Sequence, residues 1–208
     1  MGKKLIISQI HSEKKAQKFS TFFFKALFLL STLSNIFVYA SNVGQHDYKI
    51  VVKKGNNSLT IEQNGQIIKT YHIATGRGGT GDKVKRGDKK TPTGKYKVTG
   101  FNESSKFDFF FQINYPNVKD AYYGFKRSLI TKKEFDKIIS AIRENRHPPQ
   151  NTLLGGAIGI HGIGIETRKK IIIHENINWT EGCIALRNFE ARDLKKFVKL
   201  GTIVNIQE

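Results

Sequence analysis

The sequence predicts a β-rich α+β domain of mostly antiparallel strands with two helices. Short β-branched runs separated by glycine-rich turns indicate the strands. Helical periodicity of apolar residues is confined to about 131–145 and 188–200. A chain of 208 residues with 19 Gly and only 4 Pro has room for one such domain and a targeting segment.

The first forty residues have the composition of an export signal. Six lysines and one acid, Glu13, precede or interrupt an uncharged apolar stretch at 26–40 that ends on the small residue Ala40. This order predicts a secretory signal peptide over 1–40, with an uncleaved N-terminal anchor as the alternative. Fifteen uncharged residues are short for a membrane span. We therefore expect residues 41–208 to form a single domain exported to the periplasm or cell envelope, with membrane contact only through the N-terminal segment if that is not cleaved.

The predicted domain opens with three strands, at 48–53, 58–62 and 66–74. Asn64-Gly65 between the last two is a strong hairpin signal, because both residues accept positive φ. The polar loop 75–94 contains Gly76-x-Gly78-x-x-Gly81, which superficially fits a dinucleotide-binding motif. No apolar helical periodicity follows it, so we reject that interpretation. A fourth strand is predicted at 94–101.

Two helices and two further strands complete the prediction. Thr131-Lys-Lys-Glu134 is a capping box, and an apolar stripe follows it until His147-Pro148-Pro149. A second helix is predicted from Asn188 to about 200, and a last strand at 202–206. The apolar run Ile171–Ile173 is predicted as a strand that ends at His174.

Charge and cysteine content limit the classes of function. The net charge of +18 favours an anionic partner, but export and the lack of a basic helix or an aromatic RNA-binding signature argue against nucleic acid. A lone cysteine can form neither an internal disulfide nor a Cys-based zinc cage. His161, Glu166, His174 and Glu175 fit no standard ligand spacing, so no metal site is predicted.

The lone cysteine stands in a context suited to a nucleophile. Gly182 before Cys183 permits a sharp turn that leaves backbone amides free to face an oxyanion. His161 follows the short apolar run 157–160 and precedes Gly162, at the predicted end of a strand. Because a free thiol is mostly protonated at neutral pH, a paired imidazole is the usual means of raising its thiolate fraction. The residues alone leave a catalytic pair and a structural role both open.

His161-Gly162, followed after seventeen residues by Thr180-Glu181-Gly182-Cys183-Ile184, resembles the L,D-transpeptidase catalytic domain of the YkuD type. The opening strands and Thr91-Pro92-Thr93-Gly94 agree with that family, and the resemblance covers about 47–208. Two positions depart from its common Ser-His-Gly-Cys-Ile-Arg motif, since Glu181 replaces the second histidine and Ala185 replaces the arginine. The variant resembles a subgroup with Thr-x-Gly-Cys-Ile-Ala.

The resemblance implies a fold, a mechanism and roles for named residues. The fold would be a sandwich or partly open barrel. Cys183 would attack a peptidoglycan stem tetrapeptide, with His161 as base and no cofactor, to release D-Ala and form a crosslink. The remaining expected roles are oxyanion binding or imidazole orientation for Gly182, Thr180 and Gly162, and substrate binding for Trp179, Arg187 and His174. The alternatives are an L,D-carboxypeptidase or endopeptidase of the same fold, and a non-enzymatic wall-binding protein with a degenerate site.

Overall fold

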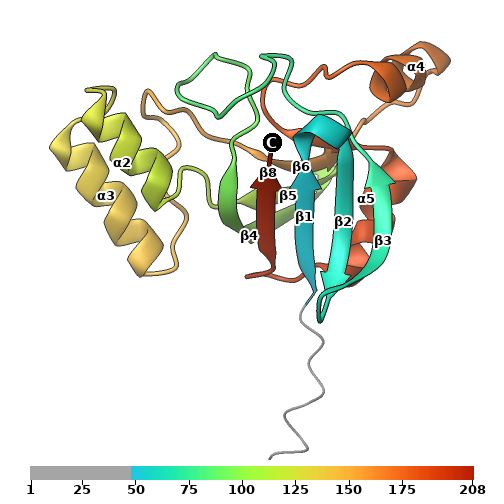
Figure 1. The fold of residues 1–208 in the computed structure, drawn as a ribbon, viewed down its shortest axis with the longest axis horizontal. Coiled ribbons are helices and arrows are strands. Elements are labelled where there is room, and N and C mark those ends of the chain that lie inside the picture. Colours follow the sequence, from blue (N-terminus) through green and yellow to red (C-terminus); the bar gives the residue numbers. More distant parts are fainter. Residues whose placement is uncertain (1–47) are drawn as a thin grey trace, which may run out of the picture. The chain divides into compact units, whose positions relative to one another are not determined.

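The computed structural model describes residues 48–208, except for the side chains of 104 and 105 (Figure 1). The predicted signal segment, 1–40, lies outside the described residues. Within 48–208, no helix has both the length and the apolar character needed to cross a membrane. Residues from 47 onward form one compact unit.

The first three strands form the predicted meander. Strands β1 (Lys49–Lys53), β2 (Ser58–Gln63) and β3 (Gln66–His72) pair antiparallel in chain order. The turn between β2 and β3 has Asn64 at φ 50° and Gly65 at φ 80°, which confirms the hairpin predicted from Asn-Gly. The last strand, β8 (Ile203–Gln207), lies parallel to β1 on its other side.

Eight strands form one mixed sheet in the order β3-β2-β1-β8-β4-β5-β6-β7. The remaining strands are β4 (Gly94–Ser105), β5 (Asp108–Ile113), β6 (Gly159–Gly162) and β7 (Ile184–Leu186). Only β1–β8 and β6–β7 are parallel pairs, so the predicted β-rich, mostly antiparallel α+β fold is confirmed. The sheet is not closed.

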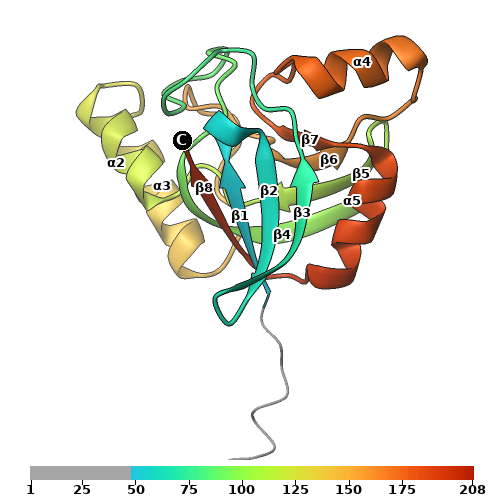
Figure 2. The same cartoon turned by 45° about the vertical axis from the view of Figure 1, so that its right-hand side comes forward.

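Strand β4 joins two differently oriented parts of the sheet (Figures 1 and 2). Its first residues, Gly94–Lys97, pair with β8, and from Val98 onward it pairs with β5 after a register shift. The sheet therefore bends, and the segment after β3 meets β7. Ala74 N–H donates to the Ala185 carbonyl (3.1 Å) and Ala185 N–H donates to the Ala74 carbonyl (2.8 Å).

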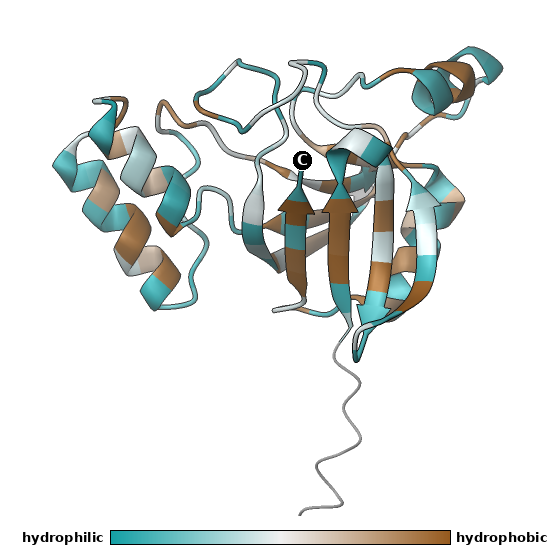
Figure 3. Ribbon diagram, in the orientation of Figure 1, coloured by the Kyte–Doolittle hydropathy of each residue, from teal (hydrophilic) through white to brown (hydrophobic). Residues whose placement is uncertain are grey.

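The main core lies between the two parts of the bent sheet and the helix α5 (Asn188–Leu194). Apolar side chains of β1, β2, β4, β5, β6, β7 and β8 meet there, and Ala191 and Leu194 of α5 pack against them. Figure 3 shows the corresponding apolar stretches along the strands. Helix α5 is shorter than the predicted 188–200, because a short 3-10 turn, Lys195–Phe197, follows it.

Two helices form a hairpin beside the sheet (Figure 1). Helix α3 (Lys132–Arg143) begins at the predicted capping box, in which Thr131 and Glu134 bond reciprocally. Helix α2 (Val118–Lys126) was not predicted. The hairpin has its own small core, formed by Ala121, Ile130, Ile138 and Leu154.

The strand predicted at Ile171–Ile173 is wrong, because these residues belong to helix α4 (Arg168–Asn176). Thr167 caps this helix by accepting a hydrogen bond from Lys170 N–H. Three consecutive apolar residues cannot distinguish a strand from a helix, and the cap, which carries the information, lies upstream of the run. His174 is consequently buried on a helix rather than placed at a strand end.

Candidate active site

Cys183 stands at the end of a tight turn that leads into β7. The preceding residue, Gly182, has φ +133°, a conformation that residues with a side chain rarely adopt. A Cβ there would lie 2.9 Å from the Lys90 carbonyl oxygen. Only glycine therefore lets the chain turn into the cysteine while passing this close to the 82–90 loop.

Two buried threonine hydroxyls hold this turn. Thr180 Oγ1 accepts from Gly182 N–H (3.1 Å) and donates to the Cys183 carbonyl (2.6 Å). Thr91 Oγ1 donates to the same carbonyl (3.4 Å) and accepts from Gly76 N–H (2.9 Å). Thr180 thus bonds its own turn rather than the imidazole, and the Gly182 amide that we expected to face an oxyanion already has a partner.

His161 lies on β6 with its imidazole enclosed by aromatic rings. Nδ1 is 2.7 Å from the Gly162 carbonyl oxygen, which can only accept, so Nδ1 carries the proton and Nε2 keeps a lone pair. The Phe107 ring stacks on the imidazole at 4.2 Å between centroids, and the Trp179 ring meets it edge-on at 6.2 Å. The ring is 2% exposed, so its orientation is set by its surroundings.

The parallel pairing of β6 and β7 places His161 and Cys183 on one face. His161 pairs with Ala185, and Cys183 precedes Ala185 by two residues. Side chains two positions apart on a strand share a face, so the thiol and the imidazole are diagonal neighbours. Within the described residues no hydrogen bond joins them, and the thiol donates instead to the Ala157 carbonyl (3.4 Å).

Burial keeps both groups neutral. It raises the pKa of the Cys183 thiol to about 11, an effect opposed by the Gly159 amide and the Lys83 ammonium. Burial also lowers the pKa of His161 to about 4, opposed by the hydrogen bond to Gly162. Near pH 7 the stable pair is therefore a thiol beside a neutral imidazole, not the ionised pair expected from the sequence.

The other predicted residues surround this pair at different positions. Trp179 Nε1–H donates to His174 Nδ1 (3.4 Å), so the buried His174 supports the tryptophan that meets His161. The Arg187 guanidinium is held by Glu166 (3.2 Å) and Glu175 (3.4 Å). It is therefore not free to replace the arginine that the resemblance leads one to expect two residues past the cysteine.

The two departures from the family motif have different surroundings. Glu181 is exposed and paired with Arg77 at the surface. Ala185 is fully buried and bonded to Ala74, in a cluster with Ile163, where a guanidinium would have neither room nor a partner. The Glu181 substitution thus alters the rim of the site, and Ala185 belongs to the packing beneath it.

Several contributors to the site were not predicted. They are Phe107, Phe110, the Ala157 carbonyl, the Thr91 hydroxyl and Lys83. Each reaches the cysteine or the histidine from a distant part of the chain, and backbone carbonyls leave no trace in residue type. The exception is Thr91, whose Thr-Pro-Thr-Gly segment was singled out without its contact being foreseen. Among the described residues, no group of three or more His, Cys, Asp or Glu side chains is placed to hold a metal ion.

Residues 47–206 match the family model of the L,D-transpeptidase catalytic domain, YkuD. The match covers most of the chain, which therefore belongs to this family. A search of curated proteins finds no match.

Solved structures show the same fold. The helical cell shape determining protein Pgp2 from Campylobacter jejuni is 25% identical with a TM-score of 0.53, over 79% of this chain and 49% of that one. An L,D-transpeptidase from Mycobacterium smegmatis is 11% identical with a TM-score of 0.46, over 78% and 59%. The chain spans about half the length of the Campylobacter protein.

Proposed function

We propose that the protein is a peptidoglycan L,D-transpeptidase that works by cysteine acyl transfer on stem tetrapeptides. The observation that carries this proposal is the placement of Cys183 and His161 on one face of two paired strands, within a domain of this family. The net charge of +18 is consistent with an anionic wall polymer as partner. No cofactor is needed for the chemistry.

In the first step the Cys183 sulfur attacks the carbonyl carbon between the third residue of the stem and the terminal D-Ala. The thiol leaves the Ala157 carbonyl and gives its proton to Nε2 of His161 as the S–C bond forms. The resulting imidazolium is stabilised through Nδ1–H by the Gly162 carbonyl. Collapse of the tetrahedral intermediate breaks the C–N bond, the imidazolium protonates the leaving amine, and D-Ala departs from a thioester.

In the second step an amine of a neighbouring stem attacks the thioester and gives its proton to His161. The C–S bond breaks, the sulfur recovers a proton, and a new amide crosslinks the two stems. Water in place of the amine would give a free carboxylic acid, which is the L,D-carboxypeptidase outcome. An oxyanion hole on the Cys183 side of the turn would use the Cys183 amide, because the Gly182 amide is held by Thr180.

The proposal extends to location. A chemistry that consumes assembled stem peptides requires the envelope, so we propose that the domain acts after export through the signal at 1–40.

Intact-mass and product analysis tests the function. Purified protein incubated with stem tetrapeptides should show a thioester adduct on its single cysteine, release of D-Ala and a crosslinked dimer. Cys183→Ala and His161→Gln should abolish D-Ala release. Monomeric products alone would identify a hydrolase, and full activity of Cys183→Ala would overturn any thiol mechanism. Binding without turnover would indicate a wall-binding protein with an inactive site.

A further inference from the structure

A cavity of about 340 Å³ lies between the 82–90 loop and helix α2. It shares a wall with the active site. Lys90 lines the cavity, and its backbone carbonyl is the group that approaches Gly182. Lys83, which also lines it, is the cation that opposes the rise in the pKa of the Cys183 thiol.

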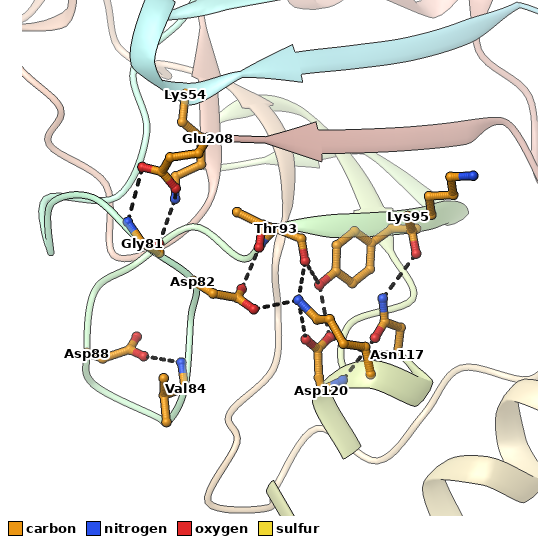
Figure 4. A network of polar contacts seen from close by, with 12 residues as sticks. Lys54, Gly81, Asp82, Val84, Asp88, Thr93, Lys95, Asn117, Asp120 and Glu208 are labelled. Atoms are coloured by element: carbon orange, nitrogen blue, oxygen red, sulfur yellow. Dashed lines mark hydrogen bonds and ion pairs between the residues drawn. The ribbon is translucent and has the colours of Figure 1, made fainter. Parts of the chain in front are cut away.

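The acidic side chains of the cavity are bound to their own surroundings (Figure 4). Lys119 ties them together, since its ammonium lies 2.5 Å from Asp82 Oδ2 and 3.3 Å from Asp120 Oδ1. The other oxygen of Asp120 accepts from Tyr96 O–H and Asn117 N–H, both at 2.9 Å. These contacts hold the start of α2 against β4 and form the floor of the cavity.

Two of the cations that line the cavity have no carboxylate partner. Lys83 is paired with Asp88 at 2.8 Å. Among the described residues, by contrast, neither Lys90 nor Arg127 forms an ion pair, and the Arg127 guanidinium lies 5.4 Å from the Tyr123 ring centroid. One is half-buried on the loop and the other exposed on α2, so they face the cavity from opposite sides.

The cavity also holds an unused acceptor. Asp120 Oδ1 is buried and accepts no hydrogen bond, because the Lys119 ammonium at 3.3 Å is not in hydrogen-bonding geometry. Two unpaired cations and one buried acceptor are complementary to a carboxylate that has an N–H donor beside it. The end or an acidic side chain of a short peptide has this chemistry.

We propose that this cavity binds a carboxylate of the stem peptide through Lys90 and Arg127, next to the thiol. The inference rests on the proposed function, because it assigns a subsite to that substrate. Two sources share the chemistry, namely the terminal D-Ala carboxylate and a free side-chain carboxylate on the third residue. Charge-assisted hydrogen bonds of this kind change affinity by about tenfold or more.

Binding to the Cys183→Ala protein tests the subsite without requiring turnover. Three synthetic tetrapeptides are titrated by calorimetry: one with both carboxylates free, one with the third-residue carboxylate amidated, and one ending in D-alaninamide. One of the two amides should weaken binding about tenfold or more, and it identifies the source. In the added double substitution Lys90→Met and Arg127→Gln, the same amide should change affinity less than about twofold.

Lys126→Gln is the matched control, because it removes a cation from the same helix outside the cavity and should keep the full discrimination. Thermal unfolding checks that each variant folds. Equal binding of all three peptides, discrimination that survives in the double variant, or no binding of the free tetrapeptide would each overturn the subsite. Failure of the proposed function would appear separately, as the absence of a thioester on Cys183 in the unsubstituted protein.

Discussion

Cys183 illustrates how a buried thiol can serve as a nucleophile without being ionised at rest. Its surroundings remove water from the sulfur and so favour the protonated form. The nearby imidazole is neutral for the same reason, with the lone pair of Nε2 free to take a proton. Proton transfer is therefore expected to accompany attack on the substrate rather than precede it.

The protonation state of the thiol predicts how its alkylation depends on pH. Because the thiolate is the reactive form and the pKa is about 11, the rate with iodoacetamide should rise about tenfold per pH unit from pH 7 to beyond pH 9. The mass shift of the intact protein measures it, since the chain has one cysteine. A short peptide spanning 181–185 is the control and should level off near the free-thiol value of about 8.5. A plateau below pH 8 in the folded protein would contradict the structure.

The turn at 180–183 shows how an element smaller than a helix positions the nucleophile. The Thr180 hydroxyl closes it at both ends, on the Gly182 amide and on the Cys183 carbonyl. The left-handed Gly182 supplies the reversal that L side chains resist. Position and direction of the sulfur thus depend on a hydroxyl three residues upstream.

Substitution at Thr180 separates its hydroxyl from its volume. Thr180→Val should lower the free energy of unfolding by about 1–3 kcal/mol, because it leaves the buried Gly182 amide and Cys183 carbonyl short of a partner. Thr180→Ser keeps the hydroxyl and should recover most of that loss. Urea denaturation measures both, and D-Ala release should follow the same order. Equal stability of the valine and serine variants would show that the two hydrogen bonds do not matter.

The helical hairpin is the element that distinguishes the rim of the site. Helices α2 and α3 pack on their own small core, and Lys119, Asp120 and Asn117 fasten the hairpin to the sheet. Because the hairpin brings Arg127 opposite Lys90, its insertion between β5 and β6 creates the proposed carboxylate subsite.

At the scale of the whole molecule, bending of the sheet buries two histidines near each other. His161 and His174 come from β6 and α4, and Trp179 contacts both. Burial lowers the pKa of each to about 4. Folding therefore requires both imidazoles to stay neutral where the unfolded chain would protonate them.

This coupling predicts acid sensitivity. Between pH 6.5 and 4 the unfolded state binds more protons than the folded state, so the free energy of unfolding should fall as pH decreases through this window. His161 alone should contribute about 2 kcal/mol between pH 6.5 and 5. Urea denaturation at pH 7.5 and 5.0 measures the slope, and His161→Gln should flatten it.

Comparison of the two proteins at each pH cancels the carboxyl groups. Burial raises the pKa of Asp120 and Glu190, an effect that works in the opposite direction in acid and is common to both proteins. An identical pH slope in His161→Gln and the unsubstituted protein would contradict the assignment to His161.

Local patterns were sufficient for some elements and not for others. The 64–65 hairpin and helix α3 were predictable because Asn-Gly and a capping box act within a few residues. Helix α2 was missed although Asn117 and Asp120 form a capping box, because exposed aromatic residues mask its periodicity. Helix α4 was mistaken for a strand because its apolar run is short and half-exposed.

By itself the sequence determined the β-rich class, the nucleophile-bearing Gly182-Cys183 step and the histidine that accompanies it, since these depend on residue type and short spacing. Tertiary structure decided the protonation of that pair, the partners of Thr180 and Arg187, and the meeting of Lys90 with Arg127 across a cavity. Desolvation and charge pairing depend on which distant segments fold together, and the bent sheet and inserted hairpin bring those segments into contact only after the whole domain has packed.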